Sequence, residues 1–101
     1  MAIVKVTAQN FEEKVLKSEK TVLLDFYADW CGPCQMVAPT LEKISNEHPE
    51  IVVGKINVDE QMPLAMQFGI DSIPALFVMK EGKVANKSVG LKTEEMILKM
   101  I

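Results

Sequence analysis

The fold is decided by the stretch from Thr21 to Cys34, which reads TVLLDFYADWCGPC. Its first half, Thr21–Tyr27, is apolar at nearly every position except Asp25. A run that is apolar on both faces predicts a central strand of a parallel sheet. The second half places two cysteines around Gly32 and Pro33, and a helical pattern of apolar residues follows at once. The sequence therefore predicts a buried strand that leads directly into a Cys-x-x-Cys helix start.

Strand and helix signals alternate on both sides of this stretch, which predicts an α/β fold with parallel crossovers. The expected helices begin near residues 10, 33, 63 and 93, and the expected strands are residues 3–6, 21–27, 51–58, 75–79 and 84–89. In chain order these elements give βαβαβαββα, a mixed five-stranded sheet flanked by helices on both faces. A chain of 101 residues has room for a single domain, residues 1–101.

Two helix starts carry specific capping signals. Asn10 lies three residues before Glu13, a spacing at which each side chain can cap the backbone of the other. Thr93 is followed by two glutamates, and a hydroxyl cap and negative charge both suit the positive end of a helix dipole. The last helix is expected to pack through its apolar residues, Met96, Ile97 and Met100.

Composition and charge exclude several classes of function. With 49% apolar and 25% charged residues, the chain is neither disordered nor a membrane protein. A net charge of -3 argues against a nucleic-acid partner, because neutralising phosphates needs a basic surface. The first ten residues lack the apolar core of a secretion signal, so we expect a cytoplasmic protein.

Two structural explanations for the spacing of the two cysteines, a stabilising crosslink and a zinc site, are weak. A crosslink over so short a loop stabilises a fold by about 2 kcal/mol, against about 3 kcal/mol for a 15-residue loop. A closed zinc site needs four ligands, and the only histidine, His48, lies well outside the motif. We therefore expect no metal.

A redox role has a physical mechanism. Gly32 and Pro33 place Cys31 just outside a helix, where unpaired N–H groups and the helix dipole stabilise a thiolate. This lowers the pKa of the thiol toward ambient pH, where attack on a disulfide is fastest. We expect Cys31 to be the exposed nucleophile and Cys34 to be the more buried, resolving thiol.

The motif Trp30-Cys31-Gly32-Pro33-Cys34 resembles the active-site motif of thioredoxins. The similarity continues through segments 24–28, 36–39, 55–59, 68–70 and 73–74 and through Gly82 and Gly90, so that it spans essentially the whole chain. The resemblance implies the thioredoxin fold and a protein disulfide reductase with no cofactor beyond the Cys31–Cys34 pair. It also implies thioredoxin reductase and disulfide-containing client proteins as partners. We expect a monomer.

Asp25 has two compatible interpretations. A desolvated carboxyl has a raised pKa and can accept the proton of Cys34 as a mixed disulfide resolves. Alternatively, Asp25 forms a structural ion pair with Lys55 on a neighbouring strand. The resemblance favours both, because in thioredoxins the matching carboxyl acts as a proton acceptor near the matching lysine.

The residues alone and the resemblance predict different geometries for the peptide bond before Pro74. From the residues alone a trans bond is expected, since cis occurs in only about 5–6% of X–Pro bonds. The resemblance implies a cis Ile73–Pro74 bond beside the dithiol, where the Ile73 backbone can pair with an extended substrate chain.

Trp30 and the motif glycine and proline also bear on function. Trp30 is either core or a substrate contact, and its place beside the nucleophile favours contact. The Gly32-Pro33 pair favours the dithiol form and hence a reductant. Three positions depart from the commonest family pattern and bear on substrate preference and redox poise, namely Tyr27, Gln35 and Ala75.

Two other functions remain open at this point. An oxidase or isomerase on the same fold would have a reduction potential well above the cytosolic glutathione poise. A binding module would use the fold as a scaffold, and its Cys31 would alkylate no faster than a free model thiol.

Overall fold

The computed structural model describes residues 3–101 and confirms the predicted mixed sheet. The elements in chain order are β1 (Ile3–Lys5), η1 (Glu12–Leu16), β2 (Thr21–Tyr27), α1 (Gly32–Glu47), β3 (Ile51–Asn57), α2 (Met62–Gln67), β4 (Ala75–Lys80), β5 (Lys83–Val89) and α3 (Glu94–Leu98). The strand order across the sheet is β1-β3-β2-β4-β5. Strands β1 and β2 run parallel to β3, and β4 runs antiparallel to both β2 and β5.

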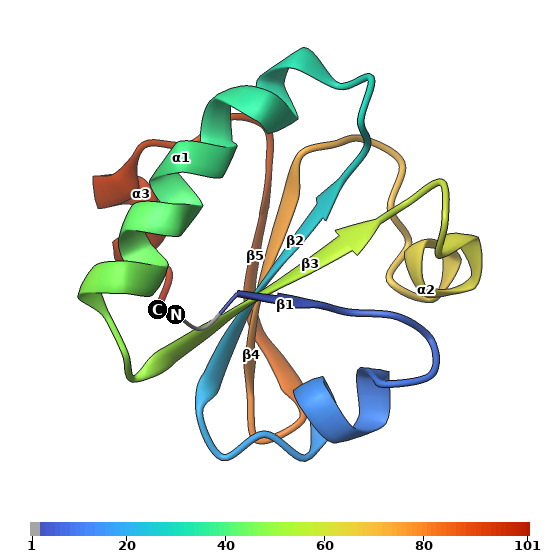
Figure 1. The fold of residues 1–101 in the computed structure, drawn as a ribbon, viewed down its shortest axis with the longest axis horizontal. Helices are drawn as coiled ribbons and strands as arrows, with labels where there is room; N and C mark the ends of the chain where they lie inside the picture. The colour runs from blue at the N-terminus through green and yellow to red at the C-terminus, as the bar shows by residue number, and fades with distance from the viewer. Residues whose placement is uncertain (1–2) are drawn as a thin grey trace.

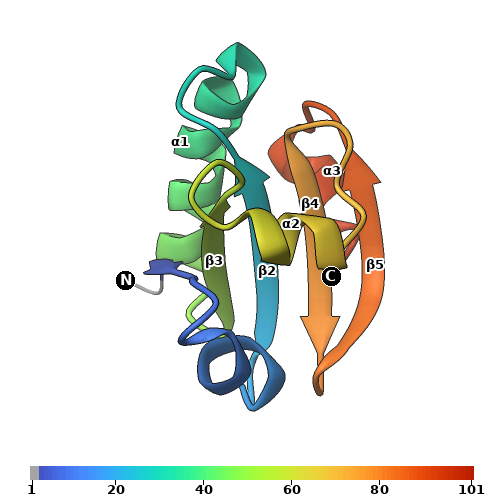
Figure 2. The same ribbon diagram turned by 90° about the vertical axis from the view of Figure 1, so that its right-hand side faces the viewer.

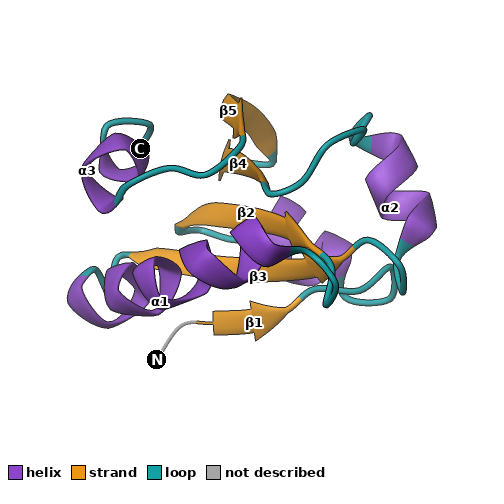
Figure 3. Ribbon diagram, turned by 90° about the horizontal axis from the view of Figure 1, so that it is seen from above, coloured by secondary structure: helices purple, strands orange, loops and turns teal. Residues whose placement is uncertain are grey.

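Helices cover both faces of the sheet, as the sequence predicts. In Figure 1, α1 and α3 lie on one side of the strands, and η1 and α2 lie on the other. Side chains of β2 alternate between these layers: Leu23 packs in the cluster that contains Val37 and Ile97, whereas Leu24 packs in the cluster that contains Val15. Figures 2 and 3 show the same sheet, with helical layers on its two sides, from two further directions. The central strand is therefore buried on both faces.

Gly54 marks a close approach within β3. A Cβ atom at this position would lie 2.9 Å from Cγ2 of Val6 and 3.0 Å from Cδ2 of Leu24. Both neighbours are fully buried. Glycine therefore lets the chain that leaves β1 pack closely against the middle of the sheet.

The first helical segment differs from the expectation. It is a π-helical turn of five residues, with a bond of 2.9 Å from the Lys17 N–H to the Glu12 carbonyl. No side chain caps it, so the predicted pairing of Asn10 with Glu13 is wrong. The reason is that the Asn10 side chain serves the preceding turn: its Oδ1 accepts from the Thr7 N–H at 2.8 Å.

The last helix confirms the predicted cap but not the whole apolar face. The Thr93 hydroxyl oxygen accepts from the Met96 N–H at 3.2 Å. Ile97 is fully buried and Met100 packs against the same cluster, whereas Met96 is 47% exposed. Residues 96 and 97 are adjacent on a helix and point about 100° apart, and in α3 it is Ile97 that faces the core.

The two outer strands of the sheet differ from the inner ones. Strand β1 has only three residues, and β5 is almost entirely exposed and carries Lys83 and Lys87. The register between β4 and β5 shifts at Val78 and Met79. Within residues 3–101, no helix is both long and apolar enough to cross a lipid bilayer.

Candidate active site

The two cysteines lie at the amino-terminal end of α1 and are joined by a disulfide. Cys31 is the N-cap residue, with an extended backbone, and Pro33 stands in the first turn. The Cys34 N–H donates to Sγ of Cys31 at 3.2 Å. No acidic residue lies in the first turn of α1. A thiolate on Cys31 would therefore meet a backbone donor and the positive end of the helix dipole.

We expected Cys31 to be exposed, and for this oxidised form that prediction is wrong. Cys31 is 4% exposed and Cys34 is 3% exposed, so the two differ only slightly. The disulfide holds the two sulfurs together in a small cluster with Ala28, and Tyr27 and Ile73 are among the side chains packed against it. Residues 32 and 33, between the two cysteines, are exposed.

The Asp25 carboxyl is fully buried, and its negative charge is only partly compensated by its neighbours. Neither of its oxygens has a hydrogen-bond partner, and Nζ of Lys55 lies 4.0 Å from Oδ2. Desolvation raises the pKa of Asp25 from 3.8 to about 6, while the Lys55 charge acts in the opposite direction. The ion pair with Lys55 is therefore present but loose, and the carboxyl can gain or lose a proton close to neutral pH.

Lys55 lies between this carboxyl and solvent. Its side chain is 27% exposed, and its Nζ lies 4.6 Å from the centroid of the Tyr27 ring. Tyr27, Cys34 and Lys55 together line a surface pocket of about 250 Å³. Gln35 borders the same pocket, and its amide donates to the Asp29 carbonyl at 2.9 Å. The pocket thus brings solvent to the side of Cys34.

The Ile73–Pro74 peptide bond is cis, the geometry that the resemblance implies. Ile73 packs against the cysteine cluster, and Pro74 is buried. Gly90 has a φ of 98°, which favours glycine, and its N–H donates to the Pro74 carbonyl at 2.8 Å. Gly90 thereby fixes the end of β5 to the proline next to the disulfide.

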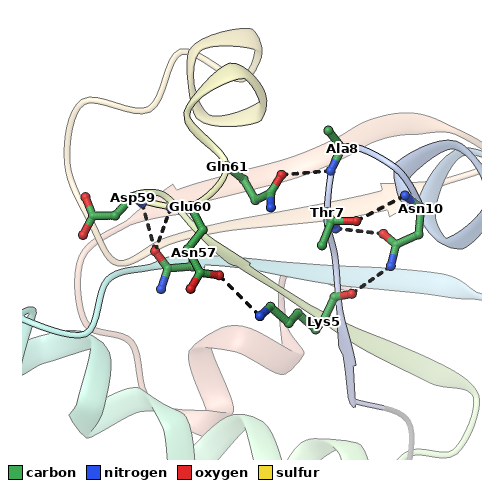
Figure 4. A network of polar contacts seen from close by, with 8 residues as sticks. All are labelled: Lys5, Thr7, Ala8, Asn10, Asn57, Asp59, Glu60 and Gln61. Carbon is green, nitrogen blue, oxygen red and sulfur yellow. Dashed lines mark hydrogen bonds and ion pairs between the residues drawn. The ribbon is translucent and has the colours of Figure 1, made fainter.

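Trp30 is not a core residue, because 71% of it is exposed. Its indole N–H donates to Oδ2 of Asp59 at 2.9 Å. Asn57, at the end of β3, holds the turn that carries Asp59: its Oδ1 accepts from the Asp59 N–H at 2.9 Å and from the Glu60 N–H at 3.3 Å. Figure 4 shows this turn linked to Lys5, the last residue of β1, through Glu60.

Asp59 and Asn57 are the site residues that the sequence reasoning missed. An Asn-x-Asp segment directly after a strand is typical of a turn in which the amide side chain accepts backbone N–H groups. That signal was present in residues 57–59. It does not identify Trp30 as the partner, because the two segments are far apart in the sequence.

A possible group of metal ligands lies elsewhere. Among residues 3–101, Glu47, His48 and Glu94 have ligand atoms within 4.8 Å of one another. Glu47 and His48 lie at the carboxyl end of α1 and Glu94 at the start of α3, whereas the cysteines lie at the amino-terminal end of α1. Nζ of Lys43 is 3.0 Å from Oε1 of Glu94, and Nδ1 of His48 is 3.3 Å from Oε2 of Glu50. Glu94 and His48 are thus already partnered.

Comparison with known proteins gives a consistent result. A family model described as Thioredoxin matches residues 2–101. A thioredoxin from Bacillus subtilis (strain 168) is 45% identical over 102 residues, covering 100% of this chain and 96% of the relative. A thioredoxin from Chlorobaculum thiosulfatiphilum is 43% identical over 96 residues, covering 94% of this chain and 89% of the relative. One from Streptomyces clavuligerus is 45% identical over 94 residues, covering 93% and 88%.

Proposed function

Because this chain belongs to the thioredoxin family, we propose that Cys31 attacks client disulfides and that Cys34 resolves the resulting mixed disulfide. The protein is a thiol–disulfide oxidoreductase that reduces protein disulfides with its cysteine pair. The assignment of roles rests on one observation: Sγ of Cys31 accepts the Cys34 N–H at the start of α1. A thiol in that position ionises more easily than its neighbour inside the helix.

The reaction consists of two exchanges and moves two electrons. The Cys31 thiolate forms a bond to one sulfur of the client disulfide, and the other client sulfur leaves as a thiolate that takes up a proton. Cys34 then loses its proton and attacks Sγ of Cys31. The mixed disulfide breaks, the client leaves as a dithiol, and the protein is left with the Cys31–Cys34 disulfide. No further cofactor is needed to carry the electrons.

Asp25 is the proposed acceptor of the Cys34 proton. A general base works best when its pKa is near the working pH, and burial raises the pKa of Asp25 to about 6. Cys34 and Lys55 share the wall of one pocket, so water there can carry the proton between Cys34 and the buried carboxyl. Lys55 compensates the charge that forms on Asp25.

Client binding is assigned to the rim around the disulfide. We place Trp30, Gly32 and Pro33 on one side and Ile73 on the other, followed by the buried Pro74, whose carbonyl accepts the bond from Gly90. A pocket of about 170 Å³ lies between Trp30 and Ile73. An extended client segment can pair with the backbone at Ile73 while its side chain enters this pocket.

Thioredoxin reductase is the proposed source of electrons, and disulfide-containing proteins are the clients. We assign the protein to the cytoplasm as a monomer. The net charge of -3 argues against nucleic acid as a partner.

A coupled assay tests the proposal. With NADPH and a thioredoxin reductase, the protein should reduce a protein disulfide such as those of insulin. Cys31→Ser should abolish turnover, whereas a Cys34→Ser variant should still form a mixed disulfide. Turnover by Cys31→Ser that equals the parent rate would disprove the assigned roles. A redox titration separates the proposal from an oxidase, because a reductant has a potential near or below the cytosolic glutathione poise.

A further inference from the structure

Three polar side chains gather on the α1 face of the sheet. Asp25 and Tyr27 are two positions apart on β2, so both point to the same face. Lys55 is the register partner of Asp25 on the parallel strand β3 and shares that face. The ammonium of Lys55 therefore has two neighbours: the Asp25 carboxylate oxygen at 4.0 Å and the Tyr27 ring at 4.6 Å from its centroid.

The carboxyl alone does not hold this ammonium in place. At 4.0 Å the two groups make no hydrogen bond, and neither oxygen of Asp25 has any hydrogen-bond partner. The Lys55 side chain is partly exposed and borders a pocket of about 250 Å³, so hydrated positions lie within its reach. Long lysine side chains normally place their charge in water. A further interaction is needed to keep the ammonium on the inner side.

The Tyr27 ring supplies that interaction. A lysine ammonium within about 6 Å of an aromatic centroid is attracted by the negative face of the ring. The ring also lines the pocket that Lys55 borders.

We propose that Tyr27 is a positioning residue for the proton-transfer step, because its ring tethers the Lys55 ammonium beside the Asp25 carboxyl. This inference rests on the proposed function, in which Asp25 accepts the Cys34 proton. It gives a role to a position at which this chain departs from the commonest pattern of the family.

Lys55 is the cation on which the carboxyl depends. From β4, the register partner of Asp25 is the apolar Leu76. From α1, the titratable group at this pocket is Cys34, which in this form is part of the disulfide. Asp29 lies at the pocket and carries negative charge. Among these described neighbours only Lys55 can stabilise the ionised form of Asp25, so displacing its ammonium must raise the pKa of Asp25.

A carboxyl carbon NMR titration of the oxidised protein tests the tether directly. Tyr27→Leu keeps apolar volume and removes the ring, and should raise the pKa of Asp25 by about 0.5. Tyr27→Phe keeps the ring face and should leave the pKa at the parent value. Lys55→Met should raise it at least as much as Tyr27→Leu does. In the Lys55→Met background, Tyr27→Leu should add no further rise, because the tethered group is gone.

The outcomes separate the tether from the proposed function. An unchanged or lowered pKa in Tyr27→Leu would overturn the tether, as would an equal rise in the Lys55→Met background. The NMR titration does not depend on disulfide reduction. The pH profile for resolution of a mixed disulfide should move upward with the pKa in Tyr27→Leu. If the pKa moves as expected and this profile does not, the role of Asp25 as proton acceptor fails while the tether stands.

Discussion

Replacing Asp25 with asparagine should make the oxidised protein increasingly more stable than the parent as the pH rises. The folded parent holds the Asp25 proton up to a pKa of about 6, whereas in the unfolded chain this carboxyl has its ordinary pKa of 3.8. Between these values the folded state binds more protons than the unfolded chain. The free energy of unfolding of the parent therefore falls as the pH rises through this window. Asparagine carries no proton to lose, so the variant lacks this decline.

The size of the effect follows from the pKa. A rise from 3.8 to about 6 is a difference of about 2, and each unit corresponds to about 1.4 kcal/mol. The parent should thus lose about 3 kcal/mol relative to Asp25→Asn between about pH 3 and about pH 8. The geometry agrees in direction, because the ionised carboxyl is fully buried, makes no hydrogen bond and has the Lys55 ammonium no nearer than 4.0 Å.

Urea unfolding of both oxidised proteins at several pH values measures this difference. The buried disulfide stays closed in both proteins, so its effect on the entropy of the unfolded chain is the same in both. Asp71→Asn, which removes an exposed carboxylate, is the control variant and is unfolded at the same pH values. A difference between Asp25→Asn and the parent that stays constant, or that shrinks toward high pH, would refute the reasoning.

Three other predictions concern the site and the packing. Cys34→Ser should accumulate a mixed disulfide between Cys31 and a client, visible by mass spectrometry, because no second thiol releases it. Asp25→Asn should slow resolution by at least about tenfold near neutral pH in stopped-flow measurements and leave the first attack unaffected. Gly54→Ala should cost about 1–3 kcal/mol in urea unfolding, because its Cβ would lie 2.9 Å from Val6. The matched change Gly32→Ala should cost much less, since no atom lies within 4 Å of the added Cβ.

The strands and the position of the redox motif were predictable because their signals are local. The apolar run Thr21–Tyr27 is buried along nearly all of its length, as a central strand must be. Thr93 caps its helix as predicted, since the hydroxyl reaches its own backbone three residues on. The carboxyl of Asp25 could be recognised because it interrupts an otherwise apolar strand.

The remaining features depend on contacts that are distant in sequence or on competition between local partners. Asn10 has two possible backbone partners, and its spacing to Glu13 does not show that the Thr7 turn prevails. The low exposure of Cys31 arises from the disulfide and from Tyr27 and Ile73 packed around it. The bond from Trp30 to Asp59 joins two loops that only the folded sheet brings together.

The outer strands of the sheet bear on how the protein behaves when it is concentrated. An exposed strand edge is a template onto which another chain can add a strand and start aggregation. Here one edge is only three residues long, and the other carries the positive charges of Lys83 and Lys87 beside a register shift. Short edges, lysines and bulges are the devices that oppose such addition. Molecules of this protein therefore have little tendency to join edge to edge, which favours high solubility in a crowded solution.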